Sequence, residues 1–204
     1  MTVLRPVDDR GSTLPIYIWL TTILLFAAFA FFAFAQAAFA RNGAQSAADA
    51  AALAAAQEAR DELILQLGDV IGTDDNWLDW LDLPGNEGVP YEGAYDAAQQ
   101  LAAENDASVE DFGTAEAGGY PGFHVGVLTD YTVGDSIIPG TENRQARADA
   151  VAVIQPRCEF DGNADPTKPV EVVCDDETVN IDPEDFDLDD LPDASAMFSV
   201  RLAE

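Results

Sequence analysis

The stretch LPIYIWLTTILLFAAFAFFAFAQAAFA, residues 14–40, decides how the rest of the chain is arranged. Its 27 residues carry no charge, and the nearest charged side chains are Arg10 and Arg41. A helix of this length rises about 40 Å, which is enough to cross a hydrocarbon core of about 30 Å with some tilt. Lipid offers the backbone no water, so we expect a transmembrane helix, with Pro15 tolerated in its first turn.

The helix is expected to continue beyond the membrane. Residues 41–71 consist almost entirely of strong helix formers and extend the apolar segment into one rod of about 55 residues. An apolar stripe is predicted on its aqueous half, from residues spaced three, four or seven apart: Leu53, Ala56, Leu63, Leu67 and Val70. Residues 47–56 are rich in alanine and form a slim surface that another helix or a sheet can approach closely.

The charge of the chain is concentrated in its C-terminal part. The formal net charge is −29, and residues 1–40 hold two Arg against two Asp, so all of it lies beyond residue 40. Such a charge argues against nucleic acid and anionic lipid headgroups as partners. We divide the chain into a cytoplasmic stub (1–13), a transmembrane helix (14–40), an extracytoplasmic extension of that helix (41–72) and an acidic α+β ectodomain (73–204).

The period of the sequence changes after the rod. Residues 73–90 read as a loop with a short turn that bears Trp77 and Trp80, and residues 91–106 as a second, shorter helix. Alternation of apolar and polar side chains predicts strands at 123–133 and 145–154, joined by a long connection over 134–143. Further strands are expected at 170–174 and 197–202, with an edge strand at 108–112. Together they predict one antiparallel sheet packed on helices, an α+β fold.

The two cysteines, Cys158 and Cys174, lie 16 positions apart. In an exported domain the expected arrangement is a single disulfide, worth about 3 kcal/mol in the chain-entropy model. Two unpaired thiols are the alternative. A metal site would need more ligands than two cysteines and the one distant histidine supply.

The orientation and processing of the span leave two interpretations open. Arg5 and Arg10 precede the span and Arg41 follows it, which gives a weak positive-inside bias for the N-terminus. However, residues 33–35 and 38–40 both have the A-x-A pattern of a signal-peptidase site. The apolar run exceeds the usual h-region of about 7–15 residues, which favours an uncleaved anchor with its C-terminal part outside the cell.

Neither the acidic loops nor the single histidine forms a recognisable chemical site. Asp185, Asp187 and Asp189 have the first three spacings of an EF-hand loop, but Asp190 replaces its glycine and Ala196 its final glutamate. Solvated loops are therefore favoured over a calcium site. His124 lies within a predicted strand with no nucleophile elbow nearby, and no phosphate-binding loop or HExxH motif is present. We expect no enzyme, no cofactor and no small-molecule substrate.

The segment RNGAQSAADAAALAAA, residues 41–56, follows the span directly, and Arg10-Gly11-Ser12 precedes it. Together they resemble the N-terminal region of the TadE/TadG-like family of bacterial tight-adherence (Flp-type) pilus assembly, where R-x-x-x-Q-x-A-A-D-A-A-A-L-A-A-A is typical behind one transmembrane helix. The matching positions are Arg41, Gln45, Ala47, Ala48, Asp49, Ala50, Ala51, Ala52 and Leu53. The resemblance covers residues 10–60 and implies an envelope-anchored, pseudopilin-like or accessory component of a pilus or secretion assembly, without catalysis. It also implies that the predicted α+β fold is pilin-like.

One position departs from that family pattern. Prepilin-peptidase substrates usually carry glycine before the cut and glutamate at the fifth mature position, which is Ile16 when counted from Ser12. This departure favours a TadG-like role retained in the membrane over a processed, TadE-like pseudopilin.

The first hypothesis is a single-pass protein of the cell membrane, N-terminus cytoplasmic, that acts in such an assembly through helix packing and ectodomain contacts. Its partners would be the lipid bilayer and other pilus-assembly or pseudopilin-like membrane proteins. The residues expected to pack against partner helices are Phe26, Phe29 and Phe32 in lipid and Ala47, Ala51, Leu53 and Ala54 just above it. The second hypothesis is an exported acidic binding module, with or without Ca²⁺ dependence, whose N-terminus serves only as an export signal or anchor.

Overall fold

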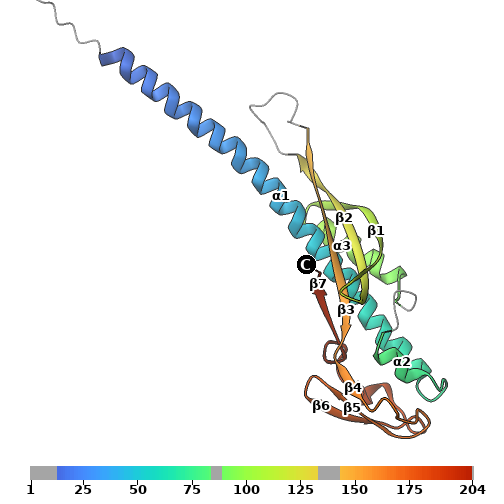
Figure 1. The fold of residues 1–204 in the computed structure, drawn as a ribbon. Coiled ribbons are helices and arrows are strands. Elements are labelled where there is room, and N and C mark those ends of the chain that lie inside the picture. Colours follow the sequence, from blue (N-terminus) through green and yellow to red (C-terminus); the bar gives the residue numbers. More distant parts are fainter. Residues whose placement is uncertain (1–12, 84–88, 133–142, 204) are drawn as a thin grey trace, which may run out of the picture.

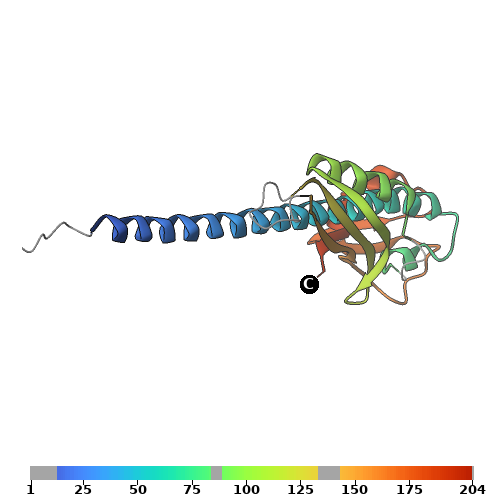
Figure 2. The same cartoon turned by 90° about the horizontal axis from the view of Figure 1, so that it is seen from above.

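The computed structural model describes residues 13–83, 89–132 and 143–203. Its dominant element is helix α1 (Thr13–Val70), a single helix of 58 residues. The N-terminal half of α1 projects alone, whereas its C-terminal half runs through the folded domain (Figures 1 and 2). The predicted rod is therefore confirmed, and so is the α+β class of the fold.

Two glycines mark the junctions of α1 with the domain. The helix passes through Gly43 without a break, and the side chain of Tyr131 takes the space beside it: a Cβ at position 43 would lie 2.1 Å from the Tyr131 hydroxyl. At the other end, Gly72 has a φ of +79° directly after the helix, where a side chain would also meet the backbone of Pro183. A left-handed glycine just beyond the last turn is a common way to end a helix.

The larger sheet has the strand order β1-β2-β3-β7 and is antiparallel throughout. Its strands are β1 (Ala107–Ala117), β2 (Tyr120–Thr132), β3 (Gln145–Pro156) and β7 (Phe198–Leu202). β1 and β2 are joined through Gly118 and Gly119, both with positive φ, as a two-residue hairpin of type I′ requires. The predicted edge strand at 108–112 is thus only part of a longer one. The predicted connection 134–143 lies almost wholly outside the described residues.

One face of this sheet is covered by α1 and by helix α3 (Glu92–Glu104) (Figure 2). The two helices meet through alanines: Ala94, Ala98 and Ala102 of α3 are buried, as are seven alanines of α1 between residues 47 and 59. Small side chains let helix backbones approach closely. From the sheet, Phe123, Val125 and Val127 of β2 point into the same core, as their alternation predicts.

The remaining strands form a separate sheet at the far end of α1, in the order β4-β5-β6 (Figure 1). They are β4 (Cys158–Phe160), β5 (Val170–Cys174) and β6 (Glu177–Ile181). The prediction of one sheet containing residues 170–174 is therefore wrong. The chain leaves the larger sheet at Arg157, one residue after β3 ends, and a strand of three residues is too short to show a period in the sequence.

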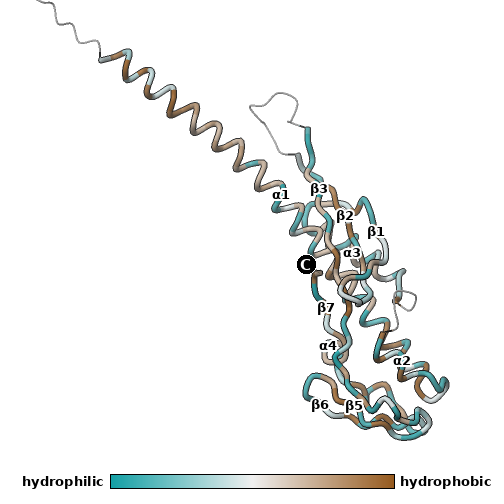
Figure 3. The backbone as a smooth tube through the Cα atoms, in the orientation of Figure 1, coloured by the Kyte–Doolittle hydropathy of each residue, from teal (hydrophilic) through white to brown (hydrophobic). Residues whose placement is uncertain are grey.

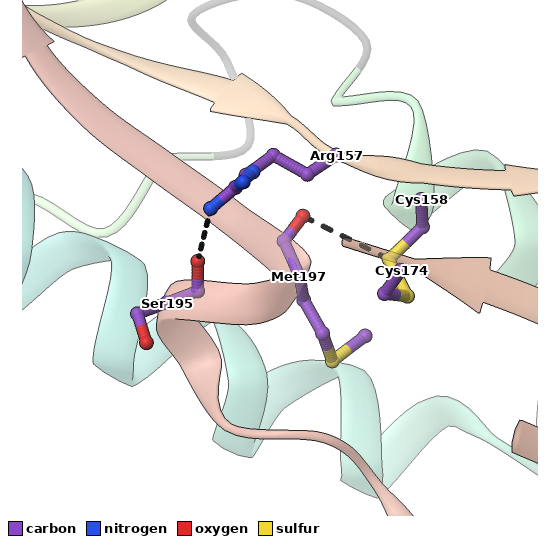
Figure 4. Close-up of a disulfide and its surroundings, with 5 residues drawn as sticks. All are labelled: Arg157, Cys158, Cys174, Ser195 and Met197. Carbon is purple, nitrogen blue, oxygen red and sulfur yellow. Dashed lines mark hydrogen bonds between the residues drawn. A yellow bond between two sulfur atoms is a disulfide. The ribbon is translucent and has the colours of Figure 1, made fainter. Parts of the chain in front are cut away.

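The predicted disulfide between Cys158 and Cys174 is present, and it joins directly opposed residues of β4 and β5 (Figure 4). Cys158 Sγ lies 3.8 Å from the carbonyl oxygen of Met197, which ends helix α4 (Ala194–Met197). Arg157 donates to the carbonyl oxygen of Ser195 and pairs with the carboxylate of Asp175. The disulfide and Arg157 thus connect the smaller sheet to the segment that leads into β7.

The loops that flank the smaller sheet contact helix α2 (Trp77–Leu81) and the end of α1. Helix α2 follows α1, and the Trp77 indole is fully buried. Its Nε1 donates a hydrogen bond of 2.9 Å to the carbonyl oxygen of Pro166. Trp80 is only partly buried. A short 3-10 helix, η2 (Leu188–Asp190), lies against this end of the rod, where Leu188 contacts the surface at Gly68.

Candidate membrane anchor and interaction surface

The first half of α1 exposes apolar side chains all around the helix. It contains an 18-residue window with a mean hydropathy of 2.3, of which nothing is buried, so α1 is long and apolar enough to cross a membrane. Figure 3 shows this segment as mostly hydrophobic and projecting from the domain. Phe26, Phe29 and Phe32, predicted to pack on partner helices, are 73%, 57% and 59% exposed.

Two threonine hydroxyls in this segment bond to the helix backbone. The hydroxyls of Thr21 and Thr22 donate to backbone carbonyl oxygens of Tyr17 and Ile18, one turn earlier. A hydroxyl satisfied in this way carries little cost in an apolar environment, because its hydrogen bond is made without water.

The folded domain begins where the apolar segment ends. Ala40 is only 3% exposed, although Phe39 beside it is 77% exposed. Ala40 and Ala44 pack against Ala146 of β3 and Tyr131 of β2. No linker separates the apolar segment from the domain, so α1 determines both the height and the rotation of the domain relative to that segment.

The alanine-rich face predicted to receive another helix or sheet is covered by the chain itself. Ala47 and Ala51 have no exposed surface, because α3 and the larger sheet pack on them. In this structure, therefore, it is the chain's own domain that packs on these alanines, and not a second protein. Leu53 and Ala54 differ, since both keep part of their surface exposed.

The family-motif residues divide by role. Ala48 and Ala52 are fully buried with the other alanines, whereas Arg41 is exposed. Gln45 donates through Nε2 to Asp49 Oδ1 at 2.8 Å and to the backbone carbonyl oxygen of Asp149 at 3.4 Å. Gln45 therefore links the helix to β3, a contact that the sequence could not show because the two residues are 104 positions apart.

The outer face of the larger sheet is charged. Here the His124 imidazole lies between two carboxylates, with Nδ1 3.3 Å from Asp111 and Nε2 3.8 Å from Asp149. Beside them, Arg147 Nε lies 3.0 Å from Glu110. His124 is a surface residue of a strand, as predicted, and its neighbours are carboxylates on the two adjacent strands.

Several carboxylates of the acidic loops accept hydrogen bonds from neighbouring residues of the same loop. Asp165 accepts hydrogen bonds from Lys168 and from Thr167, and these lower its pKa to about 2. Hydrogen bonds from Asn163 likewise lower the pKa of Asp161. Asp187 caps η2 by accepting from the Asp189 amide. Within residues 13–83, 89–132 and 143–203, no group of three or more His, Cys, Asp or Glu side chains is placed to hold a metal ion.

Comparison with known proteins identifies one family. The model of the Flp pilus-assembly TadE/G-like family matches residues 11–58, which are 48 of the 204 residues. The match covers the exposed apolar half of α1 and its alanine-rich continuation, so the predicted resemblance is confirmed for this segment. No curated protein and no solved structure matches the chain significantly.

Proposed function

We propose that this chain is a single-pass membrane component of a tight-adherence (Flp-type) pilus assembly or secretion system, retained in the membrane as a TadG-like protein. One observation carries the proposal. Residues 13–58 of the segment matched by the pilus-assembly family lie in one unbroken helix, which is apolar and exposed at first and then forms part of the core of a domain. Such a helix suits a protein that must hold a folded domain at a fixed position on a membrane.

The proposed orientation places the N-terminus in the cytoplasm and the domain outside. Arg5 and Arg10 lie on the N-terminal side of the apolar segment. The disulfide between Cys158 and Cys174 suits an oxidising compartment. Both A-x-A patterns, at 33–35 and 38–40, lie within the continuous helix, which supports an uncleaved anchor.

Orientation and processing can be tested together in intact cells. Single thiols introduced by Thr2→Cys and Glu116→Cys, one on each side of the apolar segment, are exposed to a maleimide that cannot cross the membrane. We expect labelling of the second variant only, and an intact mass that corresponds to the uncleaved chain. A mature protein that begins at Gln36 or Arg41 would refute the anchor and support the exported binding module.

The assembly role needs a test of partner contacts within lipid. The exposed Phe26, Phe29 and Phe32 are the proposed helix-packing residues, with Leu53 and Ala54 above them. Phe29→Ala should reduce co-purification with other pilus-assembly membrane proteins from detergent-solubilised membranes. Leu20→Ala is the matched control, because Leu20 lies on the opposite side of the helix, about 180° around its axis. Equal loss in both variants, or in neither, would contradict a specific packing face.

A further inference from the structure

A groove lies at the height where α1 passes from its exposed apolar half into the domain. It is an open groove with a volume of about 730 Å³, lined by three segments of the chain. Phe39, Gly43 and Ser46 of α1 form one wall, since their spacing of four and three places them on the same face of the helix. The end of α3 and the end of β2 form the other walls, and Tyr131 closes the groove over Gly43.

The far side of the groove is acidic. Its lining includes the carboxylates of Glu104, Asp106 and Asp130, and no Lys or Arg is among the described residues that line it. Glu104 ends α3, whose last turn contains no basic residue, so the negative end of the helix dipole adds to these charges. Two of the carboxylates already accept one hydrogen bond each, Glu104 from Gln100 and Asp130 from Ser108.

We infer that this juxtamembrane groove binds the helix of a partner membrane protein that carries Lys or Arg just outside the lipid. The inference rests on the proposed function, because the height of the groove follows from the proposed membrane anchor. Phe39 is 77% exposed beside the acidic wall, so an apolar surface and an anionic surface meet at the level of the membrane boundary. A helix that leaves the lipid with a basic residue has the complementary pattern.

The charge of the chain decides between a partner protein and a second copy. Each copy carries a net charge of −29, all of it beyond residue 40, so two adjacent domains repel each other. A different, basic helix meets no such repulsion and can form ion pairs with the three carboxylates of the groove.

The test uses the full-length protein in phosphatidylcholine vesicles, labelled with a fluorophore on a cysteine introduced by Glu116→Cys at an exposed position of β1, away from the groove. The acceptor is a labelled synthetic Leu/Ala transmembrane peptide with two Lys at each end, and its control is the same peptide with Gln in place of Lys. Energy transfer should report association with the Lys peptide and much less with the Gln peptide. Association should weaken in salt of about 0.5 M, which screens exposed charges.

Two triple variants then locate the binding site. Glu104→Gln, Asp106→Asn and Asp130→Asn together should weaken association with the Lys peptide about tenfold, the effect of roughly three exposed ion pairs. The control neutralises three exposed carboxylates of the smaller sheet, at Glu159, Glu171 and Glu177, and should leave association unchanged.

Several outcomes would overturn the groove as a docking site. These are equal association with the Lys and Gln peptides, retained association in the groove variant, or equal weakening in the control variant. Flotation of every variant with the vesicles separates this result from failure of the membrane anchor, because a protein that does not insert also does not float.

Discussion

Replacing Ala51 with leucine distinguishes a face that is buried by the chain's own domain from one that is kept for a partner. Ala51 has no exposed surface and lies between the equally buried Ala47 and Ala55, one turn away on either side. The added carbons have no space there without separating α1 from α3 or from the sheet. Overpacking of this kind costs about 1–3 kcal/mol. For a domain of this size we expect the midpoint of thermal unfolding to fall by about 3–10 °C.

The measurement is near-ultraviolet circular dichroism of the full-length protein in detergent during heating. This signal follows the aromatic side chains that the fold holds in place, the buried Trp77 among them. The matched control is Gln57→Leu, which places the same side chain at an exposed position of the same helix. Its effect should stay within about 0.5 kcal/mol. A further control is insertion into vesicles, which neither substitution should change.

An Ala51→Leu variant that melts like the unmodified protein would show that α3 and the larger sheet do not pack tightly on this face. If that variant lost its pilus-assembly partners at full stability, the alanine face would serve a partner helix, and the packing of α3 on it would have to be displaced in the assembly.

Three further predictions concern other parts of the chain. Gly43→Ala should lower the melting temperature, because its methyl group would collide with the Tyr131 hydroxyl, although alanine favours a helix by about 1 kcal/mol over glycine. In a Tyr131→Phe background, which lacks that hydroxyl, Gly43→Ala should raise the melting temperature. Purely additive effects of the two substitutions would argue against the contact between Gly43 and Tyr131. Replacing both cysteines with alanine should destabilise the smaller sheet by about 3 kcal/mol. Amide hydrogen exchange should become faster in β4 to β6 and change little in α3, and an equal increase throughout the domain would contradict this prediction. The ionised Asp165 carboxylate should make its full contribution to the stability of its loop at any pH above its ordinary pKa of 3.8, and lose it as the pH falls through about 2. Lys168→Gln should raise the pKa of Asp165, measured by carboxyl NMR. An unchanged pKa would show that the ion pair with Lys168 is not what lowers it.

Secondary structure with a long, regular period could be predicted from the sequence. The 58-residue α1 follows from its helix formers, and β2 and β3 follow from the alternation of their side chains. The division into two sheets could not be predicted, because it depends on where the chain turns after β3 and on what lies opposite Cys158. The Gly118-Gly119 pair was a usable signal, since two glycines between alternating runs are typical of a hairpin, and it would have extended the edge strand.

The candidate surfaces could be predicted only where they lie within one helix. The apolar span and its phenylalanines are local features of the sequence. The segments that pack on Ala47 and Ala51 are α3 and the larger sheet, which lie far along the chain. A row of small residues in the sequence therefore does not show whether its own chain or another protein packs on it. The juxtamembrane groove combines Phe39, Glu104 and Asp130, and it could not be predicted for the same reason.

The absence of a linker between span and domain limits how this protein can act. Ala40 is buried directly after the last apolar residues, so the larger sheet and the end of α3 lie close to the proposed membrane surface. In the proposed orientation, a partner within the membrane can therefore reach only the juxtamembrane end of the domain. The smaller sheet lies at the far end of the rod, away from the proposed membrane surface (Figure 1). Because one helix runs between these two ends, a partner that tilts or rotates the span must move both of them together.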